Sequence, residues 1–167
     1  MGYDLPAAVG AAVSGIHTIC LAGDGSIMMN LQELETVLYN RLPMKIFIFD
    51  NGGYTSIRQT QRNLFSRDFI GCDMSSGVGF PDFAKLCSAW GFKVHEIRSH
   101  NEIAGVLADV FSGWSPEVVV VRIPAELGFS PKLSARRLPD GTMVSPSLED
   151  MFPFLPREEM ELNVCRI

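Results

Sequence analysis

The stretch ICLAGDGSIMMN, residues Ile19 to Asn30, is an apolar run that stops at Gly23-Asp24-Gly25 and is followed by an amphipathic run. The apolar part predicts a buried β-strand, and the residues after the glycines predict a helix. A dinucleotide site uses such glycines but usually avoids the charge of Asp24, whereas a metal site requires a charged ligand of this kind. Residues elsewhere in the chain distinguish these two kinds of site.

The overall composition is that of an ordinary soluble globular protein. Of its 167 residues, 47% are hydrophobic and 20% are charged, and the net charge is −5. A negative net charge does not favour binding to nucleic acid or to an anionic membrane. No apolar run approaches the roughly 20 residues that span a bilayer, and the N-terminus lacks the basic region of a signal peptide. We therefore expect a cytoplasmic protein with neither a nucleic acid nor a membrane as its partner.

The cysteines and histidines show no metal-binding spacing. We expect free thiols in a reducing cytoplasm for the cysteines and loop or surface positions for the histidines. The residues concerned are Cys20, Cys72, Cys87 and Cys165, together with His17, His95 and His100.

Apolar runs typical of buried strands alternate along the chain with segments of helical periodicity. This alternation predicts an α/β fold, an open parallel sheet with flanking helices. Gly91 is a plausible helix stop, and Asn101 is a plausible helix cap. The expected strands are 17–22, 44–49, 92–97 and 118–123, and the expected helices are 5–13, 27–42, 80–91 and 100–113.

The composition changes after Ile123. Six of the ten prolines lie between Pro124 and Pro156. We therefore expect an α/β domain over residues 1–123 and an extended Pro-rich C-terminal tail over residues 124–167. The tail is predicted to pack on the domain and to contain one short helix near Ser147–Phe152.

Two polar motifs follow the first two predicted strands. Asn51 lies 27 residues after Asp24. A helix of about 15 residues rises ~22 Å and a six-residue strand returns ~20 Å, so both side chains should reach the same edge of the sheet. A carboxylate, an amide oxygen, glycine amides and a helix N-terminus together suit a magnesium diphosphate. The dinucleotide alternative fits less well, because GDGSIM lacks the third glycine of G-x-G-x-x-G.

The paired motif GDGSIMMNLQEL and FDNGGY closely resembles the motif of thiamine diphosphate-dependent enzymes, and the stretch MGYDLPAAVGAA resembles the residues before it in acetolactate synthase-like members. The resemblance covers about residues 1–123. It implies the thiamine diphosphate-binding fold, with thiamine diphosphate and Mg²⁺ as cofactors and a 2-keto acid as substrate.

Carried over position by position, the resemblance makes Asp24 and Asn51 side-chain ligands of Mg²⁺ and the Gly53 carbonyl a third ligand. Met1 matches the residue that supports the bent cofactor. One departure is visible, because Asp50 stands where the family motif has its first asparagine. The further residues that the resemblance places against the cofactor are Gly23, Gly25, Ser26, Tyr54 and Thr55.

The resemblance assigns no catalytic residue to this chain. In the family, the glutamate that activates the cofactor lies on another cofactor-binding domain, typically on a partner subunit. We therefore expect a C-terminal fragment truncated at its N-terminus or, as the alternative, a naturally split subunit. The resemblance also implies a homo-oligomer.

Several functions are compatible with these residues. Acetolactate synthase-like carboligation is preferred over decarboxylation alone. The stretch GGYTSIRQTQ also resembles synthase-like proteins of bacterial surface-sugar pathways, in which case the acceptor could be a keto-sugar. A non-catalytic nucleotide-binding α/β module and a subunit-interaction segment are further alternatives. Within Ser56–Asn63, Arg58 or Gln61 could contact an anionic or sugar-like substrate, although a solvated helix face is the favoured interpretation.

Overall fold

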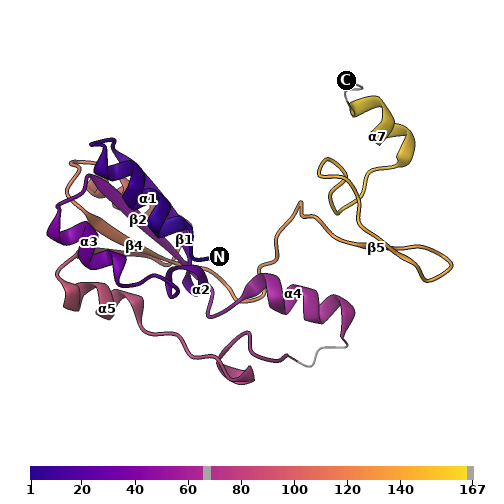
Figure 1. Cartoon of the computed structure of the whole chain (residues 1–167), viewed down its shortest axis with the longest axis horizontal. Helices are drawn as coiled ribbons and strands as arrows, with labels where there is room; N and C mark the ends of the chain where they lie inside the picture. The colour runs from indigo at the N-terminus through magenta and orange to yellow at the C-terminus, as the bar shows by residue number, and fades with distance from the viewer. Residues whose placement is uncertain (66–68, 165–167) are drawn as a thin grey trace. The chain divides into compact units, whose positions relative to one another are not determined.

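The computed structural model describes residues 1–65 and 69–164, and the chain forms two compact units, Met1–Leu127 and Gly128–Ile167. The first unit contains a four-stranded, fully parallel sheet with the strand order β1-β2-β4-β3 (Figure 1). This arrangement confirms the predicted open parallel α/β sheet. The strands are β1 (Thr18–Gly23), β2 (Met44–Asp50), β3 (Lys93–Ile97) and β4 (Glu117–Arg122).

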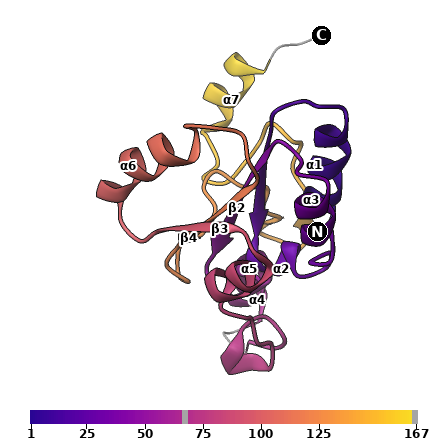
Figure 2. The same ribbon diagram turned by 90° about the vertical axis from the view of Figure 1, so that its left-hand side faces the viewer.

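Helices cover both faces of this sheet (Figure 2). The larger apolar cluster joins Leu5, Leu34 and Phe83 to one face, and the smaller cluster joins Val110 to Phe47 on the other. Both clusters remove apolar side chains from water. This burial makes the dominant favourable contribution to the stability of the fold. The helices on the first face are α1 (Asp4–Val13), α3 (Glu33–Tyr39) and α5 (Phe83–Trp90), and the helix on the second face is α6 (His100–Val110).

The edge strand β1 is less buried than its sequence predicts. Cys20 and Ala22 are buried toward α1, but Ile19 and Leu21 point to the other face and are exposed. The partners of α6 lie on β2, β3 and β4, so this helix does not cover β1. The prediction of a buried strand is correct for β2, whose first five residues are all buried, but it is wrong for β1.

The helix predicted over Ile27–Leu42 is wrong, because two shorter helices replace it. The first, α2, spans Asp24–Ile27, and the second is α3. Between them, the side chain of Asn30 donates to the carbonyl of Gly2. Asparagine side chains that bond to the backbone in this way compete with helix formation.

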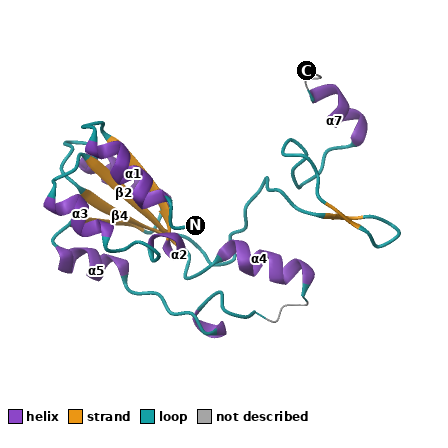
Figure 3. Cartoon of the chain, in the orientation of Figure 1, coloured by secondary structure: helices purple, strands orange, loops and turns teal. Residues whose placement is uncertain are grey.

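The ends of the later helices agree with the sequence in one case and differ in another. Gly91 ends α5 in the left-handed conformation, with φ of 107°, as predicted. The cap of α6, however, is Ser99 and not Asn101, because Ser99 and Glu102 form a reciprocal capping box. The polar segment after β2 forms the helix α4 (Thr55–Leu64), and a 3₁₀ turn, η1, follows at Met74–Ser76 (Figure 3).

The second unit has little regular structure. It contains a small antiparallel pair, β5 (Arg136–Arg137) and β6 (Met143–Val144), and the helix α7 (Arg157–Asn163). The short helix predicted near Ser147–Phe152 is wrong, because the backbone of Phe152 pairs in both directions with Lys132.

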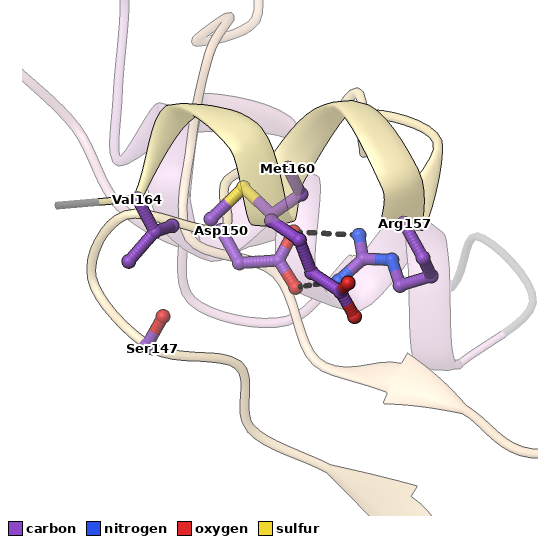
Figure 4. A pocket seen from close by; sticks show the side chains of 6 residues that line it. Ser147, Asp150, Arg157, Met160 and Val164 are labelled. Carbon is purple, nitrogen blue, oxygen red and sulfur yellow. Dashed lines mark hydrogen bonds and ion pairs between the residues drawn. The ribbon is translucent and has the colours of Figure 1, made fainter. Parts of the chain in front are cut away.

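A shallow pocket beside α7 contains the main ion pair of the second unit (Figure 4). Both carboxylate oxygens of Asp150 accept hydrogen bonds from the guanidinium of Arg157, at 2.6 and 2.8 Å. Among the described side chains of this unit, Asp150 alone is buried. The second unit therefore lacks an apolar core within the part of the chain that the structure describes.

A buried ionic cluster lies at the amino ends of the strands. Lys45 of β2 is 0% exposed and donates to Glu117 of β4 at 2.9 Å, and the ring of His95 lies 2.7 Å from the same carboxylate. Lys93 lies 3.3 Å from Glu117. Burial alone would raise the pKa of Glu117, but hydrogen bonds from His95 and Lys45 and the charge of Lys45 outweigh it and hold that pKa at about 2. His95 is thus a half-buried strand residue, and the prediction of a loop or surface position is wrong for it.

The described cysteines are unpaired thiols. Burial raises the pKa of Cys20 to about 12 and that of Cys87 to about 11, and Cys72 is buried and free. Cys165 lies outside the described residues. Among the helices that the structure describes, none has the length and apolar character that crossing a membrane requires.

Candidate cofactor site at the carboxyl edge of the sheet

Strands β1 and β2 end side by side. Gly23 pairs with Phe49 in the parallel register, so the residues that follow each strand emerge at the same edge of the sheet. Ligands of open α/β sheets bind outside this carboxyl edge. The structure therefore brings together Asp24 and Asn51, although 27 residues separate them in the sequence.

Asp24 is the centre of this arrangement. One carboxylate oxygen accepts the backbone N–H of Gly25 at 2.7 Å, and the other accepts those of Asn51 at 3.1 Å and Gly53 at 2.9 Å. The side chain is only 2% exposed. Burial raises the pKa of Asp24 even though these three hydrogen bonds act to lower it, and the nearby charge of Asp50 raises it further. A bound cation would oppose this rise in the pKa of Asp24, because an adjacent positive charge favours the ionised carboxylate.

The Asn51 loop adopts a backbone conformation that depends on glycine. Gly52 and Gly53 have φ of 71° and 151°, values that other residues rarely adopt. A Cβ on Gly53 would also lie 2.2 Å from the carbonyl oxygen of Cys72. The same carbonyl accepts the N–H of Tyr54 at 2.8 Å, so the loop is tied to the segment around Cys72. These constraints position the backbone of Asn51, whose N–H donates to Asp24.

The residues of α2 pack closely against neighbouring segments. A Cβ on Gly25 would lie 2.2 Å from the ring of Tyr54, whereas a Cβ on Gly23 would meet nothing within 4 Å. The hydroxyl of Ser26 accepts the backbone N–H of Gly2 at 2.7 Å. The glycine before Asp24 therefore faces open space, whereas the glycine after it is covered by an aromatic ring.

The remaining predicted site residues lie at the margin of this group. Thr55 is buried at the start of α4, and its N–H donates to the Gly53 carbonyl at 3.0 Å. Met1 is 76% exposed, but the next residue, Gly2, contacts Ser26. All the predicted cofactor-binding residues thus belong to the first residues of the chain, the β1–α2 junction or the β2–α4 junction.

Asp50, which departs from the family motif, has an ionic partner in this chain. It pairs in register with Arg122 of β4, whose guanidinium donates to the Asp50 carboxylate. Arg122 also contacts Glu96 of β3 at 3.1 Å. The extra negative charge at position 50 is therefore partly balanced by a cation on the adjacent strand.

The contacts of two residues of α4 reach beyond the helix, and for one of them the structure differs from the expectation. Arg58 is 7% exposed, so its interpretation as part of a solvated helix face is wrong. Its guanidinium donates to the carbonyl of Asn51 at 3.2 Å. Gln61 is half-exposed, and its amide pairs with both the N–H and the carbonyl of Ile70. Helical periodicity carries no signal for these contacts, because their partners lie outside the helix.

The donor chemistry of the site fits a hard cation bound together with a diphosphate. Asp24 and Asn51 carry side-chain oxygens, the type of ligand that Mg²⁺ prefers, and a Cβ on Gly23 would meet only open space. Among the described residues, no group of three His, Cys, Asp or Glu side chains could hold a metal. A metal at this edge would therefore need the Asn51 amide, a backbone carbonyl and ligand phosphates beside Asp24.

Residues 1–123 match the family model described as "Thiamine pyrophosphate enzyme, C-terminal TPP binding domain". The chain belongs to this family. The thiamine pyrophosphate enzymes use such a domain to bind thiamine diphosphate, which agrees with the glycine-flanked carboxylate at the sheet edge.

Relatives within the thiamine pyrophosphate enzymes include synthases and decarboxylases. The chain is 36% identical over 125 residues to the acetolactate synthase isozyme 2 large subunit of Escherichia coli (strain K12), covering 74% of this chain and 22% of that protein. The 4-hydroxybenzoylformate decarboxylase of Rhodococcus jostii RHA1 superposes with a TM-score of 0.65 and 26% identity, over 74% of this chain and 23% of that one. Benzoylformate decarboxylase from Polynucleobacter necessarius gives a TM-score of 0.64 and 29% identity, over 75% and 24%. The chain spans about a fifth of the length of its curated relatives.

Proposed function

We propose that the chain is the C-terminal cofactor-binding part of a thiamine diphosphate- and Mg²⁺-dependent enzyme that acts on 2-keto acids, as an acetolactate synthase-like carboligase. The observation that carries this proposal is the buried Asp24 carboxylate, which is hydrogen-bonded to the backbone of Asn51 and Gly53 at the carboxyl edge of the sheet. The identity to acetolactate synthase large subunits supports the choice of reaction class.

In this proposal, each group at the sheet edge has a separate task. Asp24 and Asn51 hold Mg²⁺ through side-chain oxygens, and the Gly53 carbonyl is the third protein ligand. Gly23, Gly25 and Ser26 approach the diphosphate. When bound, thiamine diphosphate supplies the nucleophilic carbon that 2-keto acid chemistry requires, while the protein orients it and excludes water.

Residues outside this cluster complete the proposal. Met1, Tyr54 and Thr55 contact the organic part of the cofactor. The glutamate that activates the cofactor comes from another domain or a partner subunit, so we propose a homo-oligomeric cytoplasmic enzyme. The division into a cofactor-binding domain over 1–123 and a tail over 124–167 that packs on it also stays a prediction.

Decarboxylation without carboligation is the second candidate function. Two superposable structures carry the names of decarboxylases, at 26% and 29% identity. Incubation with pyruvate distinguishes the two reactions, since a carboligase forms acetolactate and a simple decarboxylase releases an aldehyde. Product analysis with added keto-sugar acceptors tests the broader acceptor range.

The binding site is tested by calorimetric titration of the protein, at its natural full length, with thiamine diphosphate in the presence and absence of Mg²⁺. We expect Mg²⁺-dependent binding that Asp24→Ala abolishes. Asp24→Asn keeps the side-chain volume and should also weaken binding strongly, because it removes the charge that the metal requires. The control is Asp109→Ala, on the exposed side of α6.

Two results would contradict the proposal. The first is the absence of Mg²⁺-dependent binding in a folded, unsubstituted protein. The second is binding of ATP or NAD in preference to thiamine diphosphate, which would favour the non-catalytic nucleotide-binding module instead.

A further inference from the structure

Arg58 is a buried cation with an unusual set of partners. The side chain lies in the first turn of α4 and is 7% exposed. Its only carboxylate partner among the described residues is Asp73, at 3.5 Å, and its buried Nε has no hydrogen-bond partner among them. Burying a charge is costly unless it is well paired and fully hydrogen-bonded. The charge of Arg58 is therefore only partly compensated by its described partners.

Most contacts of Arg58 converge on one nitrogen, Nη2, at the carboxyl edge of the sheet. This atom lies 3.2 Å from the Asn51 carbonyl oxygen and 3.5 Å from the Asn51 amide oxygen. It also lies 3.1 Å from the Thr55 hydroxyl and 3.0 Å from the carbonyl of Ala125, in the segment after β4. The guanidinium thus joins the ends of β2 and β4 to the start of α4.

Asn51 is consequently held on both sides of its own backbone. Its N–H is bound by Asp24, and its carbonyl is bound by Arg58. The two residues after it, Gly52 and Gly53, have positive φ values that fix the course of the backbone but do not set the rotamer of the Asn51 side chain. Among the described residues, the partner of the Asn51 amide oxygen is Nη2 of Arg58, at 3.5 Å, so the orientation of this oxygen depends on Arg58.

We propose that Arg58 is a positioning residue that fixes the Asn51 amide oxygen and thereby makes the metal site selective for Mg²⁺ over Ca²⁺. Mg²⁺ requires near-octahedral geometry at 2.0–2.1 Å, whereas Ca²⁺ accepts flexible ligands at about 2.3–2.6 Å. A ligand that is held rigidly favours the smaller ion. This inference rests on the proposed function, because it takes Asn51 to be a metal ligand.

The test measures thiamine diphosphate binding to the full-length protein by calorimetry, at a series of Mg²⁺ or Ca²⁺ concentrations. Residues that hold a metal ligand typically contribute about 10- to 100-fold to metal affinity. We expect Arg58→Met to lower the preference for Mg²⁺ over Ca²⁺ roughly tenfold, mainly through a lost affinity for Mg²⁺. Arg58→Lys should show the same loss, because one ammonium group lacks the planar fork that reaches several acceptors.

Arg62→Met is the matched control, since Arg62 lies one turn further along α4 and is exposed. A purely structural role for Arg58 would weaken binding with both ions by the same factor, and that result would overturn the inference. An unchanged ratio in Arg58→Lys would also overturn it, even if Arg58→Met does not fold. The proposed function is tested separately, because Mg²⁺-dependent binding by the unsubstituted protein upholds it whatever the Arg58 variants do. Absence of that binding would overturn both.

Discussion

The buried ionic cluster at the amino ends of the strands should make a large, pH-dependent contribution to stability. The pKa of Glu117 falls from an ordinary value of 4.5 to about 2 in the folded chain, a difference worth about 3 kcal/mol at neutral pH. Because the folded-state pKa is lowered, this contribution is fully present above pH 4.5 and is lost as the pH falls toward 2. At about pH 3, roughly 1.5 kcal/mol should remain.

Glu117→Gln removes this contribution and leaves Lys45 buried without its anionic partner. We expect Glu117→Gln to lower the free energy of unfolding by about 3 kcal/mol at pH 7 and by about half as much at pH 3, measured by urea denaturation. Glu126→Gln, at an exposed position, is the control. The double variant Lys45→Met/Glu117→Leu should recover most of the loss, because it removes both buried charges.

An equal cost of Glu117→Gln at pH 7 and pH 3 would contradict the predicted electrostatic contribution of Glu117. Such a result would assign the loss to packing and not to charge. A cost below about 1 kcal/mol at pH 7 would also refute it, since an exposed ion pair contributes no more than that.

Two further predictions compare neighbouring positions. Gly25→Ala should destabilise the chain by about 1–3 kcal/mol and weaken thiamine diphosphate binding, because the new Cβ would meet the Tyr54 ring. Gly23→Ala should leave thermal stability nearly unchanged, because open space surrounds its new Cβ. Calorimetric melting distinguishes them, and equal losses would contradict the predicted contact. Because Ser99 is the cap of α6, Ser99→Ala should lower the free energy of unfolding, measured by urea denaturation, by about 1 kcal/mol. Asn101→Ala should leave it almost unchanged. A larger loss for Asn101→Ala than for Ser99→Ala would instead support Asn101 as the cap.

The sequence predicts the type and order of the main elements of the α/β domain, because strands that are buried in a parallel sheet appear in the sequence as continuous apolar runs. The apolar run at Met44–Phe49 is a central strand, and Gly91 ends its helix in the left-handed conformation. The proximity of Asp24 and Asn51 is predicted correctly because both follow parallel strands that end at the same edge of the sheet, although two shorter helices replace the single helix assumed between them. Propensity fails where a distant group intervenes, as when the Gly2 carbonyl accepts the side chain of Asn30 and the expected helix is interrupted.

The sequence by itself therefore determined the alternation of strands and helices, the pair of polar motifs at the carboxyl edge and the family resemblance. Only the tertiary structure decided that Arg58 is buried against Asn51, that Asp50 pairs with Arg122, and that β1 is exposed on one face. The physical reason is that periodicity records which face of an element avoids water, whereas the partner of a buried charge is set by segments distant in sequence. Arg58, for example, contacts Ala125, 67 residues further along the chain.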